Sequence, residues 1–294
     1  MTFSKFAAAA LLLSSLANGA GTEPTSSSPQ EQTPLSGPAR GAQADRPMEI
    51  YLLMGQSNMS GRGDLAKLTD AERRPDPAIR LYGNDGVWRD ALDPLDDASG
   101  QIDPVSADPD TAAVGPGLFF ARALRRTAGG RIGLVPCAKG GSRIDAWMPA
   151  PARDTLYGSC LARAREAATR GRIAGMLWYQ GESDTVTREQ ADRWPRDFAT
   201  MIAAIRHDLA APGLPLVIVG IADRPPTEKP DARPYWAQVQ AAQASLRMSC
   251  AQMVPAAGLP LKSDGLHLTT PAQRRLGAAL SQAMICLRKD VHCR

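Results

Sequence analysis

Residues 50–59 read IYLLMGQSNM, an apolar run that passes directly into a glycine and three polar side chains. Apolar runs that do not alternate with polar residues are typical of parallel strands buried on both faces. The chain repeats this pattern at 132–136, 175–179, 214–221 and, more weakly, 250–255. We therefore expect a parallel sheet of about five strands.

Helical periodicity fills the intervals between these runs. The expected helices span residues 117–128, 155–170, 188–210, 235–248 and 271–287. The last has the clearest apolar stripe, with Thr270 as the expected N-cap, Pro271 at the first position and Gln273 completing a capping box. Strands alternating with helices predict an α/β fold, a three-layer α/β/α sandwich of the flavodoxin-like kind.

The N-terminal region has a composition of its own. Residues 1–20 combine one lysine, a short apolar stretch and small residues, as a signal peptide does. The apolar stretch is shorter than the roughly 20 residues that span a bilayer. Residues 21–47 are rich in Pro, Ser, Thr and Gln and predict a flexible leader. We expect residues 48–294 to fold as one domain, secreted or periplasmic, without membrane attachment after signal cleavage.

Overall composition narrows the classes of partner. The chain is 44% hydrophobic and 22% charged, as soluble globular proteins are. Its formal net charge of +4 is spread along the sequence without a basic run, so we expect no nucleic-acid binding. The oligomeric state cannot be read from these features.

Cysteines and aspartates suggest neither a metal nor a cofactor. Five cysteines are an odd number, so at least one is unpaired within the chain. Cys137 fits a buried thiol as well as a bridge, whereas Cys286 and Cys293, near the C-terminus, could staple the tail. Eight aspartates lie between Asp85 and Asp110, but without calcium-loop spacing, and we interpret them as a solvated loop at the rim of the site.

Four of the five expected strands are followed by residues suited to chemistry. The segments are 55–59, 139–142, 180–184 and, after the fifth strand, 263–267. The carboxyl ends of parallel strands lie at one edge of a sheet, where functional groups gather. These segments would bring together a serine, backbone donors, a carboxylate and an imidazole.

The three histidines differ in how well each could serve as a base for Ser57. His207 ends a helix and His292 lies near the C-terminus, whereas His267 follows Asp264 by three residues. The Asp-x-x-His spacing favours His267 as the base. Ser57 alone could equally cap a helix. Met59 stands where the Gly-x-Ser-x-Gly elbow has glycine, so an α/β-hydrolase scaffold is not indicated.

Five motifs together resemble the SGNH-hydrolase superfamily. They are GQSNMSG (55–61), GPG (115–117), PCAKGGSRIDAW (136–147), WYQGESD (178–184) and SDGLH (263–267). Within that superfamily they look like the acetylxylan esterases of carbohydrate esterase family six and the sialate O-acetylesterases. The similarity covers residues 49–285 or so. It implies a single α/β/α domain, no cofactor, and hydrolysis of O-acetyl esters on a carbohydrate, with acetylated xylan or a related polysaccharide as the expected substrate.

The resemblance assigns roles to residues at the matching positions. Ser57 would be the nucleophile and His267 its base, with an oxyanion hole made by the backbone N–H groups of Ser57 and Gly141 and by the side-chain amide of Gln180. Gln180 stands where the wider superfamily has asparagine. Two carboxylates could orient His267: Asp264, slightly favoured, and Glu182.

The loops around these residues provide candidate substrate contacts. Gln56 and Asn58 flank Ser57, while Arg143 and Trp147 follow the Gly141 turn. Trp147 fits core packing at least as well. Three other functions stay open at this point: a sialate O-acetylesterase, a carbohydrate O-acetyltransferase with the same triad, and a non-catalytic carbohydrate-binding protein.

Overall fold

The computed structural model describes residues 47–108, 111–226 and 232–293. They fall within one unit, Arg40–Arg294. The expected signal peptide at 1–20, and all but the last residue of the expected leader at 21–47, lie outside the described residues.

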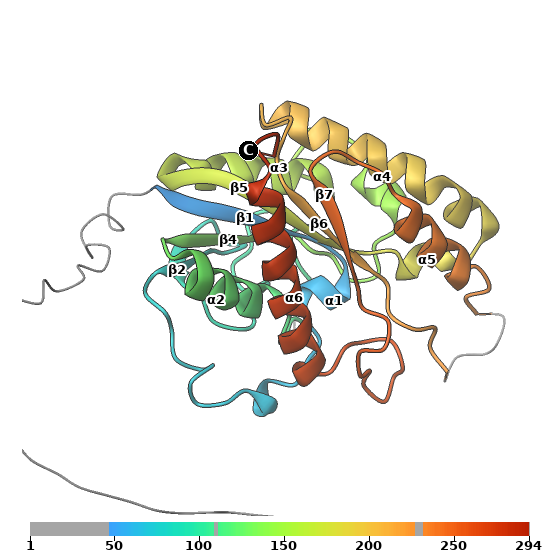
Figure 1. Cartoon of the computed structure of the whole chain (residues 1–294), viewed down its shortest axis with the longest axis horizontal. Helices are drawn as coiled ribbons and strands as arrows, with labels where there is room; N and C mark the ends of the chain where they lie inside the picture. The colour runs from blue at the N-terminus through green and yellow to red at the C-terminus, as the bar shows by residue number, and fades with distance from the viewer. Residues whose placement is uncertain (1–46, 109–110, 227–231, 294) are drawn as a thin grey trace, which may run out of the picture. The chain divides into compact units, whose positions relative to one another are not determined.

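A seven-stranded sheet forms the centre of the fold (Figure 1). Its strands are β1 (Met48–Gly55), β2 (Ile79–Tyr82), β3 (Trp88–Asp90), β4 (Ile132–Pro136), β5 (Gly171–Tyr179), β6 (Leu216–Gly220) and β7 (Ala251–Pro255), in the order β3-β2-β4-β1-β5-β6-β7. All neighbours are parallel except β2 and β3. The five strands predicted from apolar runs are confirmed, and β1 lies at the centre because it is apolar on both faces.

Strands β2 and β3 extend one edge of the sheet and were not predicted. Each is only three or four residues long, and each contains charged side chains, including Arg80 and Asp90, which form a cross-strand ion pair. Neither strand shows a continuous apolar run, although three of the four residues of β2 are buried. The prediction of about five strands therefore covers β1 and β4 to β7 and misses these two short strands.

Helices cover both faces of the sheet and produce the expected three layers (Figure 1). They are α1 (Ser57–Ser60), α2 (Gly117–Ala128), α3 (Leu156–Ala167), α4 (Arg188–Asp208), α5 (Trp236–Ser245) and α6 (Thr270–Lys289). Helices α2 and α6 pack together on one face, and α3, α4 and α5 lie on the other. Among the described helices, none combines the length and the apolar character needed to cross a membrane.

The beginning of α6 differs from the expected capping box. Thr269, not Thr270, is the N-cap, and its side chain accepts a hydrogen bond from the backbone of Ala272. The hydroxyl of Thr270 donates instead to the carbonyl of Asp64, and the amide of Gln273 donates to the carbonyl of Asn58. Both side chains therefore connect α6 to the segment that contains Ser57.

A group of aromatic side chains fills the layer between β5 and α4. Phe198 stacks on Trp194 with ring centroids 5.0 Å apart, and it also contacts Trp178, which meets Trp147 edge-on. All four side chains are fully buried. Large rigid rings of this kind contribute much of the apolar area that stabilises a core. They give the carboxyl end of β5 a fixed support.

Two disulfides join distant parts of the chain. Cys137, just after β4, is bonded to Cys160 on α3, and Cys250, just before β7, is bonded to Cys293 after α6. Cys286 is exposed and free. Of the two cysteines expected to staple the C-terminal tail, Cys293 does so through its bond to Cys250, whereas Cys286 takes no part.

We predict that replacing both Cys250 and Cys293 with alanine lowers the free energy of unfolding by about 3 to 4 kcal/mol, as expected for closing a loop of 43 residues. Cys286→Ala is the matched control and should change stability by less than about 0.5 kcal/mol. Chemical denaturation of the oxidised proteins measures both values. A double variant as stable as the parent would contradict the contribution of this bridge.

Candidate active site

The segments predicted to carry the chemistry lie together at the carboxyl edge of the sheet. The backbone N–H of Gln56, after β1, donates to the carbonyl of Tyr179 on β5 over 2.8 Å. The N–H of Lys139, after β4, donates to the carbonyl of Gly55 over 2.9 Å. The ends of the three central strands are thus bonded side by side, as parallel strands require.

Ser57, His267 and Asp264 form one chain of hydrogen bonds. Ser57 is the first residue of α1, and its Oγ lies 2.9 Å from Nε2 of His267. Nδ1 of His267 lies 2.8 Å from Oδ2 of Asp264. This geometry lets the imidazole take a proton from the serine hydroxyl while the carboxylate holds the ring.

Asp264 is held in the charged form. Its Oδ1 accepts hydrogen bonds from the backbone N–H groups of Leu266 and His267, at 2.9 and 3.0 Å. Burial alone would raise the pKa of Asp264, but the hydrogen bonds from His267 and Leu266 outweigh it and keep the pKa below its ordinary value. A negative charge at this place stabilises an imidazolium.

Glu182 lies beneath the site and does not contact the imidazole directly. Its Oε1 accepts a hydrogen bond from Nδ2 of Asn58 over 2.9 Å. Burial raises the pKa of Glu182 above its ordinary value. Of the two carboxylates considered for orienting His267, the structure thus brings Asp264 to the ring and Glu182 to Asn58.

Asn58 and Gln56 face the protein interior, which corrects the expectation that they contact substrate. Asn58 is fully buried, and besides Glu182 its side chain binds the carbonyl of Leu266 and the N–H of Leu268. Gln56 is also buried, and its Oε1 accepts from the N–H of Gly181. Both side chains connect the segment around Ser57 to neighbouring loops by hydrogen bonds.

Gly141 can present a backbone donor to a substrate. Its φ is +69°, a conformation that favours glycine, and no atom lies within 4 Å of the place that a Cβ would take. The peptide is therefore open on its outer side. A backbone N–H in such a place can approach a substrate oxygen closely, as an oxyanion hole requires.

Gln180 does not offer the donor expected of it in this conformation. Its amide nitrogen donates to the carbonyl of Ser142 over 3.1 Å and to the carboxylate of Asp184, and its Oε1 accepts from the indole of Trp194. Both amide hydrogens are thus directed at protein acceptors. Gln180 supports the loop that contains Gly141. Of the three expected oxyanion donors, the backbone N–H groups of Ser57 and Gly141 remain as candidates.

The two candidates after the Gly141 turn have different environments. Arg143 is exposed and forms an ion pair with Asp145 at 3.1 Å, so a substrate can reach it. Trp147 is fully buried, and its indole N–H donates to Oγ of Ser142 over 3.1 Å. The proposed substrate contact of Trp147 is therefore replaced by a packing role against Trp178.

The aspartate-rich segment is less solvated than expected. Asp96 is buried and accepts a hydrogen bond from Asn84 over 2.8 Å, and Asp103 is buried and forms an ion pair with Arg153. The sequence shows many aspartates but does not show these partners, which come from distant positions. In the parts of the chain that the structure describes, no group of three or more His, Cys, Asp or Glu side chains is arranged to hold a metal ion.

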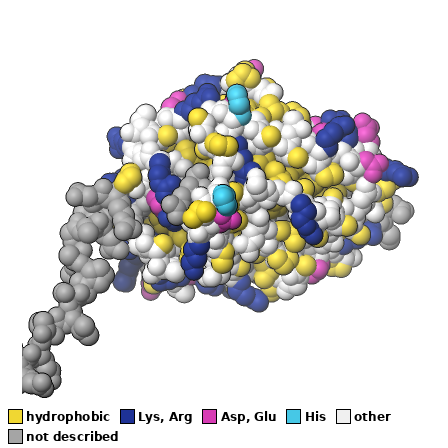
Figure 2. Space-filling model, turned by 45° about the horizontal axis from the view of Figure 1, so that its top comes forward, with side chains coloured by type: hydrophobic (Ala, Val, Ile, Leu, Met, Phe, Trp, Pro, Cys, Tyr) yellow, Lys and Arg dark blue, Asp and Glu magenta, His cyan; other side chains and the backbone are white. Residues whose placement is uncertain are grey.

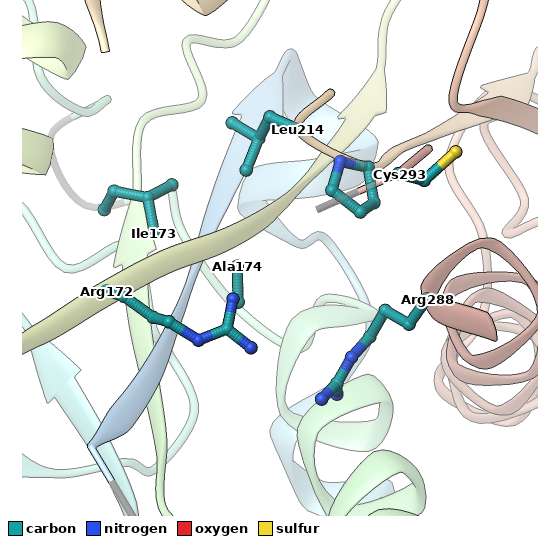
Figure 3. A pocket seen from close by; sticks show the side chains of 7 residues that line it. Arg172, Ile173, Ala174, Leu214, Arg288 and Cys293 are labelled. Carbon is teal, nitrogen blue, oxygen red and sulfur yellow. The ribbon is translucent and has the colours of Figure 1, made fainter. Parts of the chain in front are cut away.

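A cavity of about 320 Å³ lies away from these residues (Figure 3). It is lined by residues at the beginnings of β5 and β6 and by Arg288 of α6, which places it at the opposite edge of the sheet. Arg172 and Arg288 both form ion pairs with Glu49, which offsets part of their charge. This cavity is therefore separate from the serine and the imidazole.

Basic side chains lie at separate places on the face drawn in Figure 2, among hydrophobic and uncharged ones. This distribution agrees with the absence of a basic run in the sequence.

Asp184 is a buried carboxylate whose role the sequence did not reveal, although it ends the WYQGESD motif. Both of its oxygens lie 3.2 Å from the N–H of Ile144, and it also accepts from Gln180. Burial raises the pKa of Asp184 to about 7. Its only sequence signal was its place two residues after Glu182.

We predict that Asp184→Asn becomes more stable relative to the parent as the pH rises from 5 to 8. The native state keeps a proton on Asp184 up to about pH 7, whereas the unfolded chain loses it near pH 4. Parent stability therefore falls with pH in this window, by about 1 kcal/mol per pH unit, and the asparagine variant lacks this dependence. Urea denaturation at several pH values measures the difference, and parallel curves for the two proteins would refute it.

Comparisons with known proteins identify the family of the chain. A family model described as "Carbohydrate esterase, sialic acid-specific acetylesterase" matches residues 47–286. A probable carbohydrate esterase from Arabidopsis thaliana is 35% identical over 284 residues, which cover 91% of this chain and 98% of the relative.

Solved structures show the same fold. The X-ray structure of an Arabidopsis thaliana protein, 37% identical, superposes with a TM-score of 0.70 over 82% of this chain and 98% of that chain. A carbohydrate acetylesterase from Xanthomonas citri, 24% identical, has a TM-score of 0.59 over 80% of this chain and 55% of its own. NanS, 19% identical, has a TM-score of 0.62 over 83% of this chain and 99% of its own. The chain belongs to the carbohydrate esterase family of the sialic acid-specific acetylesterase type, and it is a carboxylic ester hydrolase with an SGNH-like fold.

Proposed function

We propose that this protein removes O-acetyl groups from carbohydrates by a serine mechanism, with Ser57 as nucleophile, His267 as general base and Asp264 as the carboxylate that orients the ring. The observation that carries the proposal is the continuous hydrogen-bond chain from Ser57 Oγ through the imidazole to Asp264. Serine acyl transfer needs these three groups in this order.

The reaction would proceed in two halves. Ser57 Oγ attacks the ester carbonyl while Nε2 of His267 takes its proton, and the imidazolium then protonates the departing sugar hydroxyl. Water, activated by the same imidazole, releases acetate from the acetyl-serine. The N–H groups of Ser57 and Gly141 would meet the charge on the carbonyl oxygen, and one such donor is typically worth about 3 kcal/mol in the transition state.

The openness of the site supports a large carbohydrate substrate. The side chain of Asp264 is 43% exposed and that of His267 is 19% exposed, so the imidazole lies near the surface. An acetyl group projecting from a polymer can reach such a site without the whole chain being enclosed. We propose acetylated xylan or a related polysaccharide as the substrate, encountered after export of the protein from the cytoplasm.

A sialic acid O-acetyl ester is the second candidate, because the description of the matching family names that substrate. A transfer reaction to a second sugar would use the same residues. Access of water to the partly exposed imidazole favours hydrolysis over transfer.

We predict release of acetate from acetylated carbohydrates without any added sugar acceptor, and its loss in Ser57→Ala. The screen compares acetylated xylan, acetylated chitin-like oligomers, O-acetylated sialic acids and a simple aryl acetate. Removing the hydroxyl should lower kcat by about 10⁴-fold or more with the fold retained. An organophosphonate should label Ser57 in the parent. Near-normal turnover by Ser57→Ala, or a parent inactive on every acetyl ester, would refute the proposal.

We also predict that the two carboxylates respond differently to neutral replacement. Asp264→Asn removes the charge beside His267 and should lower kcat by roughly 10³- to 10⁴-fold. Glu182→Gln keeps an acceptor for Asn58 and resembles the protonated acid that burial favours, so its kcat should fall less than about fivefold. Steady-state kinetics of both variants and of the double variant test this. Equal, multiplying losses would instead show that both charges support the imidazolium.

A further inference from the structure

Asp108 connects the two loops that flank the reaction centre. It lies between β3 and α2, and its Oδ2 forms an ion pair with Arg62 at 3.0 Å, just beyond α1. The same oxygen accepts a hydrogen bond from the backbone N–H of Gly140 over 2.6 Å, and Oδ1 lies 2.9 Å from Nζ of Lys139. One carboxylate thus contacts the segment after Ser57 and the segment before Gly141.

The absence of a side chain at Gly140 leaves room for the Asp108 carboxylate. A Cβ at residue 140 would lie 2.1 Å from Oδ2 of Asp108, well inside the distance that two atoms tolerate. Glycine is therefore required at this position for the carboxylate to reach the backbone. The short hydrogen bond involves a charged acceptor, and such bonds are about twice as strong as neutral ones.

The environment keeps Asp108 ionised. Burial alone would raise its pKa, but the hydrogen bond and charge of Lys139, the N–H of Gly140 and the charge of Arg62 together lower the pKa below its ordinary value. The side chain is only 17% exposed, so solvent weakens these contacts little. Asp108 therefore remains an acceptor throughout the neutral pH range.

We propose that Asp108 is a positioning residue for the oxyanion loop: it fixes the backbone at Gly140 so that the adjacent N–H of Gly141 faces the substrate carbonyl beside Ser57. This inference rests on the proposed esterase function. The carboxylate touches neither the substrate nor the reacting atoms, and it acts through the backbone that it holds. Arg62 connects Asp108 to the segment that follows Ser57. The backbone carbonyl of Arg62 in turn accepts a hydrogen bond from Lys262, two residues before Asp264 in the sequence.

The proposal predicts a loss in kcat and little change in KM. An oxyanion donor acts on charge that develops in the transition state, so its misplacement slows the reaction without weakening ground-state binding. Complete loss of such a donor costs about 10²- to 10³-fold. A loop that loses its anchor still visits the productive geometry, so we expect a decrease of about 10- to 100-fold in kcat for Asp108→Ala.

The experiment combines Asp108→Ala, Gly140→Ala and the double variant, with Asp103→Ala as the matched control. Asp103 lies in the same segment between β3 and α2. It forms an ion pair with Arg153 and accepts a hydrogen bond from Ser159, and neither contact involves Gly140. Kinetics on an aryl acetate and thermal unfolding are measured for each protein. We expect Asp103→Ala to lose stability but to keep kcat within about twofold of the parent.

The double variant distinguishes positioning from general destabilisation. Gly140→Ala alone should lower kcat because the new methyl displaces the carboxylate. In the Asp108→Ala background that methyl no longer clashes, so the double variant should be at most about threefold slower than the slower single variant. Asp108→Asn, which keeps an acceptor for Gly140 but loses the charge, should lie between the parent and Asp108→Ala, and it replaces the alanine variant if that one fails to fold.

Several results would overturn the inference. Parental kcat in Asp108→Ala or Asp108→Asn, losses that simply multiply in the double variant, or an equal loss of kcat in Asp103→Ala would each exclude a specific positioning role. A parent with no activity on any acetyl ester would overturn the proposed function itself, and the role of Asp108 with it. If the parent is active and the Asp108 variants have the same kcat as the parent, only the positioning role of Asp108 is overturned, and the proposed function stands.

Discussion

The side chain of Asn58 holds together the segments on which the candidate site depends. Its amide binds Glu182 after β5 and the carbonyl of Leu266, and its oxygen accepts from Leu268. The backbone carbonyl of Asn58 accepts from Gln273 of α6. Because these groups are buried, removing the amide would leave several of them unsatisfied, at about 1 to 3 kcal/mol each. The distance between Ser57 and His267 is fixed by the residue next to the serine.

This arrangement explains which parts of the fold could be predicted from the sequence. A fully buried parallel strand needs a continuous apolar run, so β1, β4, β5 and β6 were visible, and the residues after them were expected at one edge. The short strands β2 and β3 contain charged residues and show no such run. His267 could be selected from its spacing to Asp264, whereas the roles of Ser57 as nucleophile and of Asp264 as the slightly favoured acid followed from the family resemblance. The structure brings all three side chains into contact.

Roles that depend on partners distant in sequence could not be predicted in this way. Asn58 and Trp147 have side chains that suit a sugar site, but each finds its hydrogen-bond partners within the protein. Gln273 fits a capping box equally well, yet it bonds to Asn58 across 215 residues. A polar residue beside a catalytic motif can bind substrate or brace the loop, and only the three-dimensional contacts separate the two uses.

The carboxylates around the site divide according to the charge that the reaction would develop. Asp264 has a lowered pKa and lies beside the imidazole, where a positive charge would appear. Glu182 and Asp184 both have raised pKa values. Glu182 lies behind Asn58, and Asp184 lies behind Gln180, whose amide also donates to Ser142 in the loop that would hold the oxyanion. A fixed negative charge there would oppose the charge on the carbonyl oxygen, and burial suppresses it by favouring the protonated acids.

Asp108 is the exception that remains charged on the oxyanion side. The cations of Arg62 and Lys139 compensate its charge, and its Oδ2 accepts from the backbone N–H of Gly140. Burial and ion pairing thus place negative charge beside the base and limit it beside the oxyanion.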